Sequence, residues 1–324
     1  VRYRGEQPWH SLGVQKSMKI KVDRGDLVDG MRVFNLLNDP TPFGLEDQII
    51  LDLARDSGLL TPDYRPVRVR INNHDMGVYR LESQPDESLI RQNHRIPGNM
   101  YAGDAEKLRG DQAFGPLFTS TAGWTKLADR SEARAAEVAE LVRFVDAVHH
   151  ASHAEFARFA ERSLDLPRNA RFDALDVTFG GDEHDFLSNH RFYADPYRGK
   201  LEPVAWTFRG FQRDETLNGV DSPLLVRLKF TPRYLAERDR AVYQLLTGPA
   251  SVPAIHDRAE RAIAGLAEEL AADPYWDAYK LLPRASRLHR ALTRPMSFDR
   301  WILATEYEID GFGQRSRYLL DVLE

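Results

Sequence analysis

The segment that precedes a predicted β-hairpin carries the residues best suited to chemistry. In "GGDEHDFLSN", Asp185 lies four residues before Asn189, and Asp182 precedes both. Phosphoryl-transfer enzymes place an Asp that orients the acceptor hydroxyl a few residues before an Asn that holds metal. Asp185 is therefore a candidate catalytic residue with Asp182 as the alternative, and Asp185 and Asn189 are candidate metal ligands. A helix cap or turn for Asp185, and a turn or strand-edge hydrogen bond for Asn189, are the competing interpretations.

Histidines in the same region offer a different chemistry. His184 and His190 are candidate metal ligands beside these acids, although their spacing matches no established zinc motif. His149, His150 and His153 contain an i, i+4 pair, but no further ligand follows at motif spacing. This second group is more typical of a partly exposed helix face. The sequence contains neither a Walker-type loop nor a G-x-S-x-G elbow.

The composition narrows the classes of partner. The chain has 324 residues, 42% of them hydrophobic, which suffices for a sizeable core in one large domain or two ordinary ones. A net charge of −5 disfavours an extended nucleic-acid groove, and no apolar run of about 18 residues predicts a membrane span. The absence of cysteine excludes disulfides, thiolate zinc sites and thiol nucleophiles. Small molecules or other proteins are the expected partners.

A β-hairpin predicted over 189–211 must position the candidate residues. Two alternating apolar runs flank Asp195, Pro196 and Gly199, which are typical turn residues. Regular structure is expected to end after Trp206. The next residue is Thr207, a neutral side chain at a place where a metal-dependent enzyme would need a carboxylate.

The first ninety residues are rich in predicted strands. Alternation predicts strands over 17–22 and 31–37, and apolar residues at helical spacing predict a helix over 44–58 that ends at Gly58. The turn Asn72-Asn73-His74-Asp75 predicts a hairpin. We therefore expect a small sheet packed by one helix.

The remainder of the chain is predicted to be mainly helical. Residues 91–125 are rich in Gly, Asn and Pro and lack periodicity, so they are predicted to be a connector or insert. Helical patterns begin at Ser131 and, after the hairpin, recur near 232–247, 253–272, 275–291 and 297–306 and at the C-terminal end, whereas 222–230 fits a helix or a strand. The expected organisation is α+β, with a strand-rich N-lobe at 1–90, a connector at 91–125 and a mainly helical C-lobe at 126–324.

Several segments, taken in order, resemble the CotH family of atypical kinases, named for a spore-coat protein. They are "RYRG" followed by Trp9, "KSMKIKV", "FNLLND", "LDLARDSG", "VRINNHDMGVYRLE" and "NHRFYADPYRGKLEPVAW". The resemblance spans roughly residues 2–245. It implies a two-lobed protein-kinase-like fold and transfer of a phosphoryl group from ATP to a protein acceptor with a divalent metal, Mg²⁺ or Mn²⁺.

The resemblance also implies roles for particular residues. The family places a phosphate-binding Lys on the strand before the hairpin turn, where this chain has Arg68 and Arg70. Arg differs in shape and hydrogen bonding from Lys, so the replacement is not neutral. Glu82 lies about where the partner carboxylate is expected, with Ser83 at the best-aligned position. Arg4 belongs to a motif that lies near the nucleotide in the family, together with Arg2; strand-edge ion pairs are the alternative for both.

Thr207 departs from the family pattern. There the strand that ends in Trp is followed by a metal-binding Asp, so Thr207 stands at an expected metal position with a weaker ligand. Three hypotheses follow: a CotH-like phosphotransferase acting on a protein or peptide, with transfer of AMP as a variant; a pseudokinase or nucleotide-binding or interaction scaffold; or a kinase-like fold with other metal chemistry at His184 and His190. Because the chain begins with Val1 in mid-motif, we expect a trimmed upstream segment, and the compartment stays open between extracytoplasmic and cytoplasmic.

Overall fold

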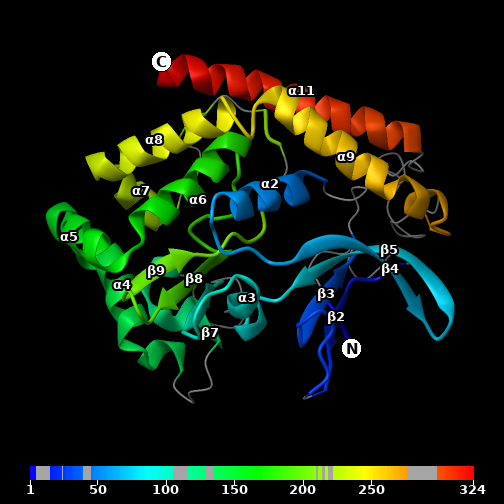
Figure 1. Cartoon of the computed structure of the whole chain (residues 1–324). Helices are drawn as coiled ribbons and strands as arrows, with labels where there is room; N and C mark the ends of the chain where they lie inside the picture. The colour runs from blue at the N-terminus through cyan, green and yellow to red at the C-terminus, as the bar shows by residue number, and fades with distance from the viewer. Residues whose placement is uncertain are drawn as a thin grey trace, which may run out of the picture.

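The computed structural model describes residues 1–4, 15–23, 25–38, 45–104, 116–128, 134–208, 211–213, 216–217, 222–275 and 298–324. These ranges form an α+β structure with two antiparallel sheets (Figure 1). The predicted helix at 275–291 lies almost wholly outside them. Among the described residues, no helix combines the length and apolar character needed to cross a membrane.

The first sheet has five strands among the described residues, in the order β1-β2-β3-β5-β4. Their bounds are β1 Arg2–Tyr3, β2 Met18–Lys21, β3 Val33–Leu37, β4 Tyr64–Ile71 and β5 His74–Ser83. Asn72 and Asn73 join β4 to β5 with φ of 49° and 64°, the left-handed backbone of a two-residue hairpin turn. The strands predicted at 17–22 and 31–37 and the hairpin at 72–75 are confirmed.

The second sheet has the order β7-β6-β8-β9. Its strands are β6 Met100–Gly103, β7 Trp124–Ala128, β8 His190–Asp195 and β9 Lys200–Pro203. β6 pairs with both β7 and β8, so the predicted connector at 91–125 contributes an inner strand of this sheet. Strand β6 was not predicted because four residues are too few to show an alternating pattern. The hairpin predicted within 189–211 is confirmed as β8 and β9.

Helices cover both sheets, and most begin or end at residues that the sequence marks. They are α2 Leu45–Asp56, α3 Glu87–Gln92, α4 Ala139–His150, α5 His153–Ser163, α6 Leu166–Phe179, α7 Pro223–Lys229, α8 Pro232–Leu246, α9 Val252–Ala271 and α11 Phe298–Leu323, with short 3₁₀ turns η2 Leu117–Thr119, η3 Thr121–Gly123 and η4 Ala135–Glu137. The ambiguous segment 222–230 is the helix α7. Asp165 caps the N-terminus of α6 by accepting from the Arg168 amide, and Gly180, with φ 73°, caps its C-terminus.

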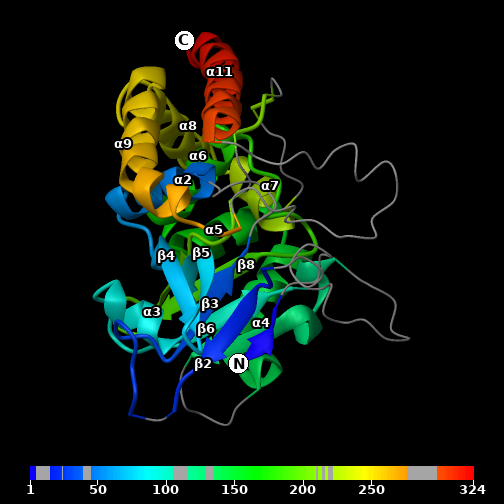
Figure 2. The same ribbon diagram turned by 90° about the vertical axis from the view of Figure 1, so that its right-hand side faces the viewer.

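The largest apolar core joins α2 to α6, α8, α9 and α11. Figure 1 shows α9 and α11 side by side across the molecule, with the end of α9 near the β4–β5 hairpin, and the view in Figure 2 agrees. A second core lies between the second sheet and helices α4, α5 and α7. Helix α2 is thus held on one side by the helical core and on the other by the first sheet, with Leu45 packed against Val78 of β5.

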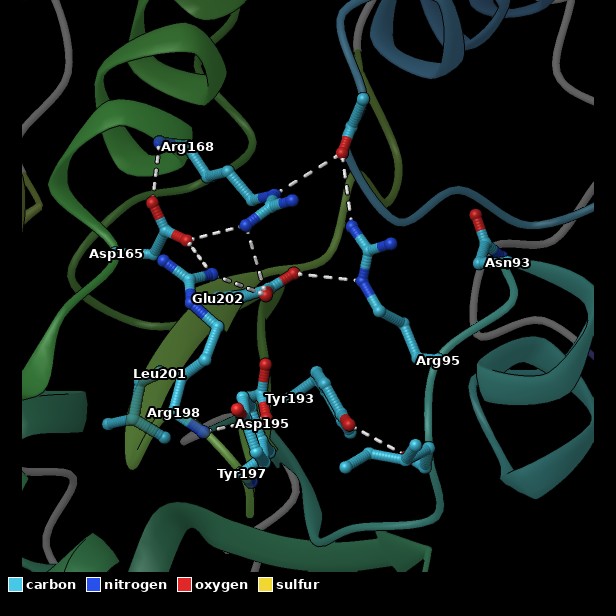
Figure 3. Close-up of polar contacts among 12 residues, drawn as sticks. Asn93, Arg95, Asp165, Arg168, Tyr193, Asp195, Tyr197, Arg198, Leu201 and Glu202 are labelled. Carbon is cyan, nitrogen blue, oxygen red and sulfur yellow. Dashed lines mark hydrogen bonds and ion pairs between the residues drawn. The ribbon is translucent and has the colours of Figure 1, made fainter.

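A network of partly exposed arginines around two buried carboxylates fixes the second sheet to α6 (Figure 3). Glu202 of β9 is 1% exposed, and its carboxylate contacts Arg168 at 3.2 Å, Arg95 at 3.3 Å and Arg198 at 3.3 Å. Arg168 and Arg198 also pair with Asp165. Burial alone would raise the pKa of Asp165, but hydrogen bonds from Arg198 and Arg168 bring it below its usual value.

The same network reaches the end of α2. Arg95 and Arg168 both donate to the carbonyl oxygen of Gly58, at 3.3 and 3.4 Å. Gly58 ends α2 with φ 78°, as the sequence predicted for a glycine cap. The ion pairs therefore connect α2, α6 and β9 at one point.

Candidate functional site

One face of the first sheet carries a line of polar side chains. Register partners run from Arg2 to Lys19, from Lys19 to Asn35, from Asn35 to Glu82 and from Glu82 to Tyr64. Because directly paired residues project to the same face of a sheet, these five side chains form one row. We call them the polar row. Of these five side chains Tyr64 also packs in the largest apolar core, whereas core packing does not explain the other four.

Glu82 is the fourth of the five residues in the polar row and binds two other polar side chains. It is 5% exposed, and its Oε2 accepts from Arg4 Nη1 at 2.7 Å and from Asn35 Nδ2 at 2.6 Å. Two residues predicted to contact the nucleotide, Arg4 and Glu82, therefore contact each other. The strand-edge ion pair weighed for Arg4 in the sequence is present, and it lies within the site.

Further ionisable groups surround Glu82. Burial raises the pKa of Asp47 on α2 well above its usual value, and the charges of Glu46, Glu82 and Glu183 add to this shift. Burial also raises the pKa of Tyr64, with a contribution from Asp47. These couplings bring α2, the first sheet and the segment before β8 into one electrostatic cluster.

Arg80 contributes a cation to the same face. It lies two residues before Glu82 on β5, is 5% exposed, and its guanidinium lies 5.1 Å from the centre of the Tyr64 ring. Burial lowers its pKa to about 10, while the charge of Glu82 opposes that shift. Arg80 therefore stays charged at neutral pH and offsets part of the negative charge of the cluster.

Asn189 lies in the segment that approaches this cluster from the second sheet. Its side-chain amide donates to Glu183 Oε2 at 3.0 Å and to the Glu183 carbonyl at 3.1 Å. Its backbone amide donates to Asp104 at 3.2 Å, and Asp104 pairs with Arg191 at 3.0 Å. Asn189 has φ 64°, a conformation that Asn tolerates better than most residues. Glu183 and Asp104 were not among the sequence candidates.

The two candidate catalytic acids differ in their surroundings. Oδ1 of Asp185 accepts from the backbone amides of Leu187 and Ser188 at 2.7 and 2.8 Å, which is the turn geometry that the sequence offered as an alternative. Asp182 is exposed. The structure therefore gives Asp185 a local structural contact and leaves Asp182 at the surface of the loop.

His184 and His190 are both buried beneath this loop. His184 Nε2 donates to the Trp206 carbonyl at 2.7 Å, and Nδ1 lies 2.9 Å from Asp176. Burial alone would lower the pKa of His184, but Asp176 raises it above its usual value. Burial lowers the pKa of His190 to about 3, and its Nε2 donates to the Asp185 carbonyl at 3.0 Å. Both rings thus fix the shape of the loop.

Thr207 follows Trp206 and adopts φ 51°. A β-branched residue in this conformation is a genuine outlier. Through Trp206, whose carbonyl is bound by His184, the segment after β9 is tied to the segment before β8. Thr207 and Asn189, both predicted metal positions, therefore belong to connected segments that share a left-handed backbone conformation.

The described residues offer oxygen donors, not a complete metal site. Within the described ranges, no group of three or more His, Cys, Asp or Glu side chains is placed to hold a metal ion. Glu183 and Asp104 present carboxylate oxygens that accept from the side-chain and backbone amides of Asn189, whose own side chain adds an amide oxygen. Mg²⁺ commonly uses one or two carboxylates and completes its coordination with phosphate oxygens and water, and this donor set fits such a shared site.

Arg68 and Arg70 lie away from the polar row. Arg68 pairs opposite Val78 on β5, four residues from Glu82, which is about 13 Å along a strand. Its guanidinium binds Asp75 and the end of α9. Arg70 is exposed near the hairpin turn. The structure therefore does not bring these two predicted phosphate ligands to Glu82.

A cavity of about 580 Å³ opens at the end of the polar row formed by Arg2 and Lys19. It is lined by Val1, Arg2, Lys19, Lys21, Val33, Gln84, Pro85, Asp86 and Leu127. Lys19 donates to Gln84 Oε1 at 2.6 Å. Sequence reasoning missed Lys19 and Lys21, although the alternation in "KSMKIKV" places both on one face of their strand.

The fold and the site define an α+β protein with a charged site beside its first sheet. The chain matches the family model described as CotH kinase protein over residues 1–294, and it belongs to that family. The family resemblance noted in the sequence is thereby confirmed. A search of curated proteins found no match.

Among solved structures, the chain is similar to a chain of the complex of HipA, HipB and operator DNA from the toxin–antitoxin system of Shewanella oneidensis MR-1. The identity is 11% and the TM-score is 0.39, over 98% of this chain and 68% of that chain.

Proposed function

We propose that this protein binds ATP along the polar row and transfers its γ-phosphoryl group to a hydroxyl of a protein or peptide. The observation that carries the proposal is the row itself, which begins with Arg2 and Lys19 at a cavity that Lys21 also lines and leads from there to Glu82. Lysine and arginine bind phosphate by charge-assisted hydrogen bonds. Membership of the CotH kinase protein family supports the same chemistry.

The cavity suits the two ends of a nucleotide. Residues 84–86 join β5 to α3, and the apolar side chains of Val33, Pro85 and Leu127 line the cavity there, which suits a flat base. In the proposal, Lys19 and Lys21 bind the phosphates, and Lys19 would exchange its contact with Gln84 for a phosphate oxygen. Arg68 and Arg70, predicted for this role, are replaced in the proposal by Lys19 and Lys21.

The transfer step needs a carboxylate that orients the acceptor hydroxyl. We assign this role to Asp182, because it is exposed, whereas Asp185 holds the turn through Leu187 and Ser188. The acceptor oxygen bonds to the γ-phosphorus, the bond between that phosphorus and the bridging oxygen of ADP breaks, and the hydroxyl proton passes to Asp182. The products are ADP and a phosphorylated acceptor.

Glu183 and Asn189, with Asp104 behind them, would hold a divalent cation in this site. Such a cation supplies positive charge to the phosphates of the nucleotide. Thr207 follows Trp206, whose carbonyl is bound by His184, and its hydroxyl is a weaker ligand than the Asp of the family pattern. The fold in this proposal is two-lobed and kinase-like, with the first sheet and α2 as the smaller lobe.

A nucleotide-binding scaffold without catalysis is the second candidate. Two observations favour it: Thr207 replaces a metal-binding carboxylate, and Arg4 is committed to Glu82 by a 2.7 Å ion pair. In that case the protein binds ATP but transfers nothing. Chemistry at a metal held by His184 and His190 has less support, because both nitrogens of His184 face protein acceptors.

Transfer of label from γ-labelled ATP to a mixture of acceptor peptides tests the proposal. We expect Asp182→Asn to lower transfer at least about 100-fold, as for the loss of a general base, while ATP binding is retained. Asp185→Asn is the matched variant, and its effect should fall mainly on thermal stability. Full transfer by Asp182→Asn would reject the assignment, and ATP binding without transfer by the wild type would favour the scaffold.

A further inference from the structure

The end of helix α9 contacts the β4–β5 hairpin at a point remote from the polar row. Arg68 donates to the Ala272 carbonyl at 2.7 Å and pairs with Glu269 at 3.3 Å, while its other contact is Asp75 within the hairpin. The carbonyl end of a helix carries partial negative charge, so a guanidinium is well placed there. Arg68 therefore joins the hairpin to α9.

Asp273 makes a second connection at the same point. Its Oδ2 accepts from the backbone amide of Val78 at 2.9 Å, and its Oδ1 accepts from the amide of Tyr275 at 2.7 Å. Asp273 is only 7% exposed. A backbone amide of an inner strand of the first sheet is thus bound by a carboxylate from a different part of the fold.

Gly77 makes this approach possible. A Cβ at position 77 would lie 2.3 Å from Asp273 Oδ1, and Gly77 has φ 76°, which also favours glycine. The register of β4 and β5 shifts between Arg68 and Arg70, next to the same contact. An irregularity of this kind beside a glycine is typical of a place where another segment approaches a strand closely.

Apolar packing surrounds these polar contacts. Val78 is 2% exposed and lies in a buried cluster with Leu45 at the start of α2, Leu266 and Leu270 of α9, and Trp301 of α11. The cluster excludes water from the bond between Asp273 and Val78, which strengthens it. The hairpin, α2, α9 and α11 therefore meet at one packed point, and Figure 1 shows α9 reaching the hairpin there.

We infer that the end of α9 is a clamp that holds the first sheet in a fixed position over the candidate site, with Arg68 and Asp273 as its positioning residues. Val78 and Glu82 lie on the same strand, so a constraint at Val78 is carried to the polar row through a paired strand. The N-terminal part of α9 packs in the core that contains α6. The segment that holds Asn189 follows α6 in the chain. The consequence for phosphoryl transfer rests on the proposed function, but the clamp itself does not.

Hydrogen exchange of the whole protein tests the clamp without any nucleotide. We expect Asp273→Ala to speed exchange at least about tenfold across β4 and β5, including amides distant from Val78, because the hairpin opens as one unit. Arg68→Ala should act in the same direction. Glu268→Ala, which removes an exposed carboxylate next to Glu269, is the matched control and should leave exchange unchanged.

A second variant at Asp273 and two further measurements distinguish the possible outcomes. Asp273→Asn retains an acceptor oxygen for Val78 and should exchange more slowly than Asp273→Ala, and circular dichroism verifies that both variants fold. Faster exchange confined to Val78, or equal exchange in Asp273→Ala and wild type, would overturn the clamp. With ATP present, the clamp variants should show a raised KM and a smaller change in kcat. If the wild type binds no ATP while the hairpin still opens in Asp273→Ala, the proposed function fails and the clamp stands.

Discussion

At the scale of single residues, the site is marked by backbone conformation as well as by charge. Asn189 and Thr207 have φ of 64° and 51°, and both stand at predicted metal positions. Holding a β-branched residue in such a conformation costs about 1–3 kcal/mol and requires support from its surroundings. His184 supplies that support through the Trp206 carbonyl. Strain retained at this point is a reason to treat it as a candidate site.

His190 makes the free energy of unfolding of the protein depend on pH. Its pKa is about 3 in the folded protein against 6.5 for an ordinary histidine, because it is buried beside His184. As pH falls below 6.5, the unfolded chain takes up a proton that the folded protein refuses, so His190 costs stability progressively between pH 6.5 and 3. The slope is about 1.4 kcal/mol per pH unit.

Urea unfolding at pH 7 and pH 5 measures this effect. Relative to His190→Gln, which cannot titrate, the wild type should lose about 2 kcal/mol between these two pH values. An equal loss in both proteins would show that His190 is protonated in the folded state.

The sequence suggested some of the candidate residues and not others, for physical reasons. Asn189 and Glu82 were predicted because their neighbourhoods carry family motifs and strand patterns, and their roles stay predictions. Arg68 was predicted to bind phosphate, but strand alternation cannot show that α9, about two hundred residues later, ends beside it. Lys19 was overlooked because strand lysines are usually solvated, and only the register with Asn35 and Glu82 reveals its place in a row.

At the scale of elements, a mutation in the network around Glu202 is expected to lower the stability of the protein. Glu202→Gln leaves three arginines around a neutral group, and we expect a loss of about 1–3 kcal/mol, since the arginines are partly exposed. Arg91→Ala breaks an exposed pair with Glu87 and should cost less than about 0.5 kcal/mol. Chemical denaturation compares the two. If the two variants lose the same free energy of unfolding, the network around Glu202 does not stabilise the packing of β9 on α6.

Long periodic elements were predictable, and short ones were not. The predicted helices at 44–58, 232–247 and 253–272 correspond to α2, α8 and α9 within one or two residues at most ends. β6 was missed because four residues carry no measurable alternation, although it pairs on both sides. The predicted helix at 297–306 is part of α11, which continues to Leu323, because Gly311 and Gly313 weaken the helical pattern without ending the helix.

At the scale of the whole molecule, two connections hold the elements of the candidate site. The Glu202 network ties α2 to α6 and β9, and the end of α9 ties the hairpin to the helical core. The acids Asp47, Glu82 and Glu183 form an electrostatic cluster of like charges, which raise the pKa of Asp47 and tie no elements together. Membership of the CotH kinase protein family gives the class of the protein, and the site decides what this member does.

The central claim is that ATP binds along the polar row with Lys19 on its phosphates, and isothermal titration with ATP in the presence of Mg²⁺ tests it most directly. The wild type should bind, and Lys19→Met should bind about 10- to 100-fold more weakly, as expected for loss of a charge-assisted hydrogen bond of about 1.5–3 kcal/mol. Arg70→Met, which removes an exposed arginine at the other end of the sheet, should bind as the wild type does. If Arg70→Met weakens binding and Lys19→Met does not, or if the wild type fails to bind, the claim is contradicted.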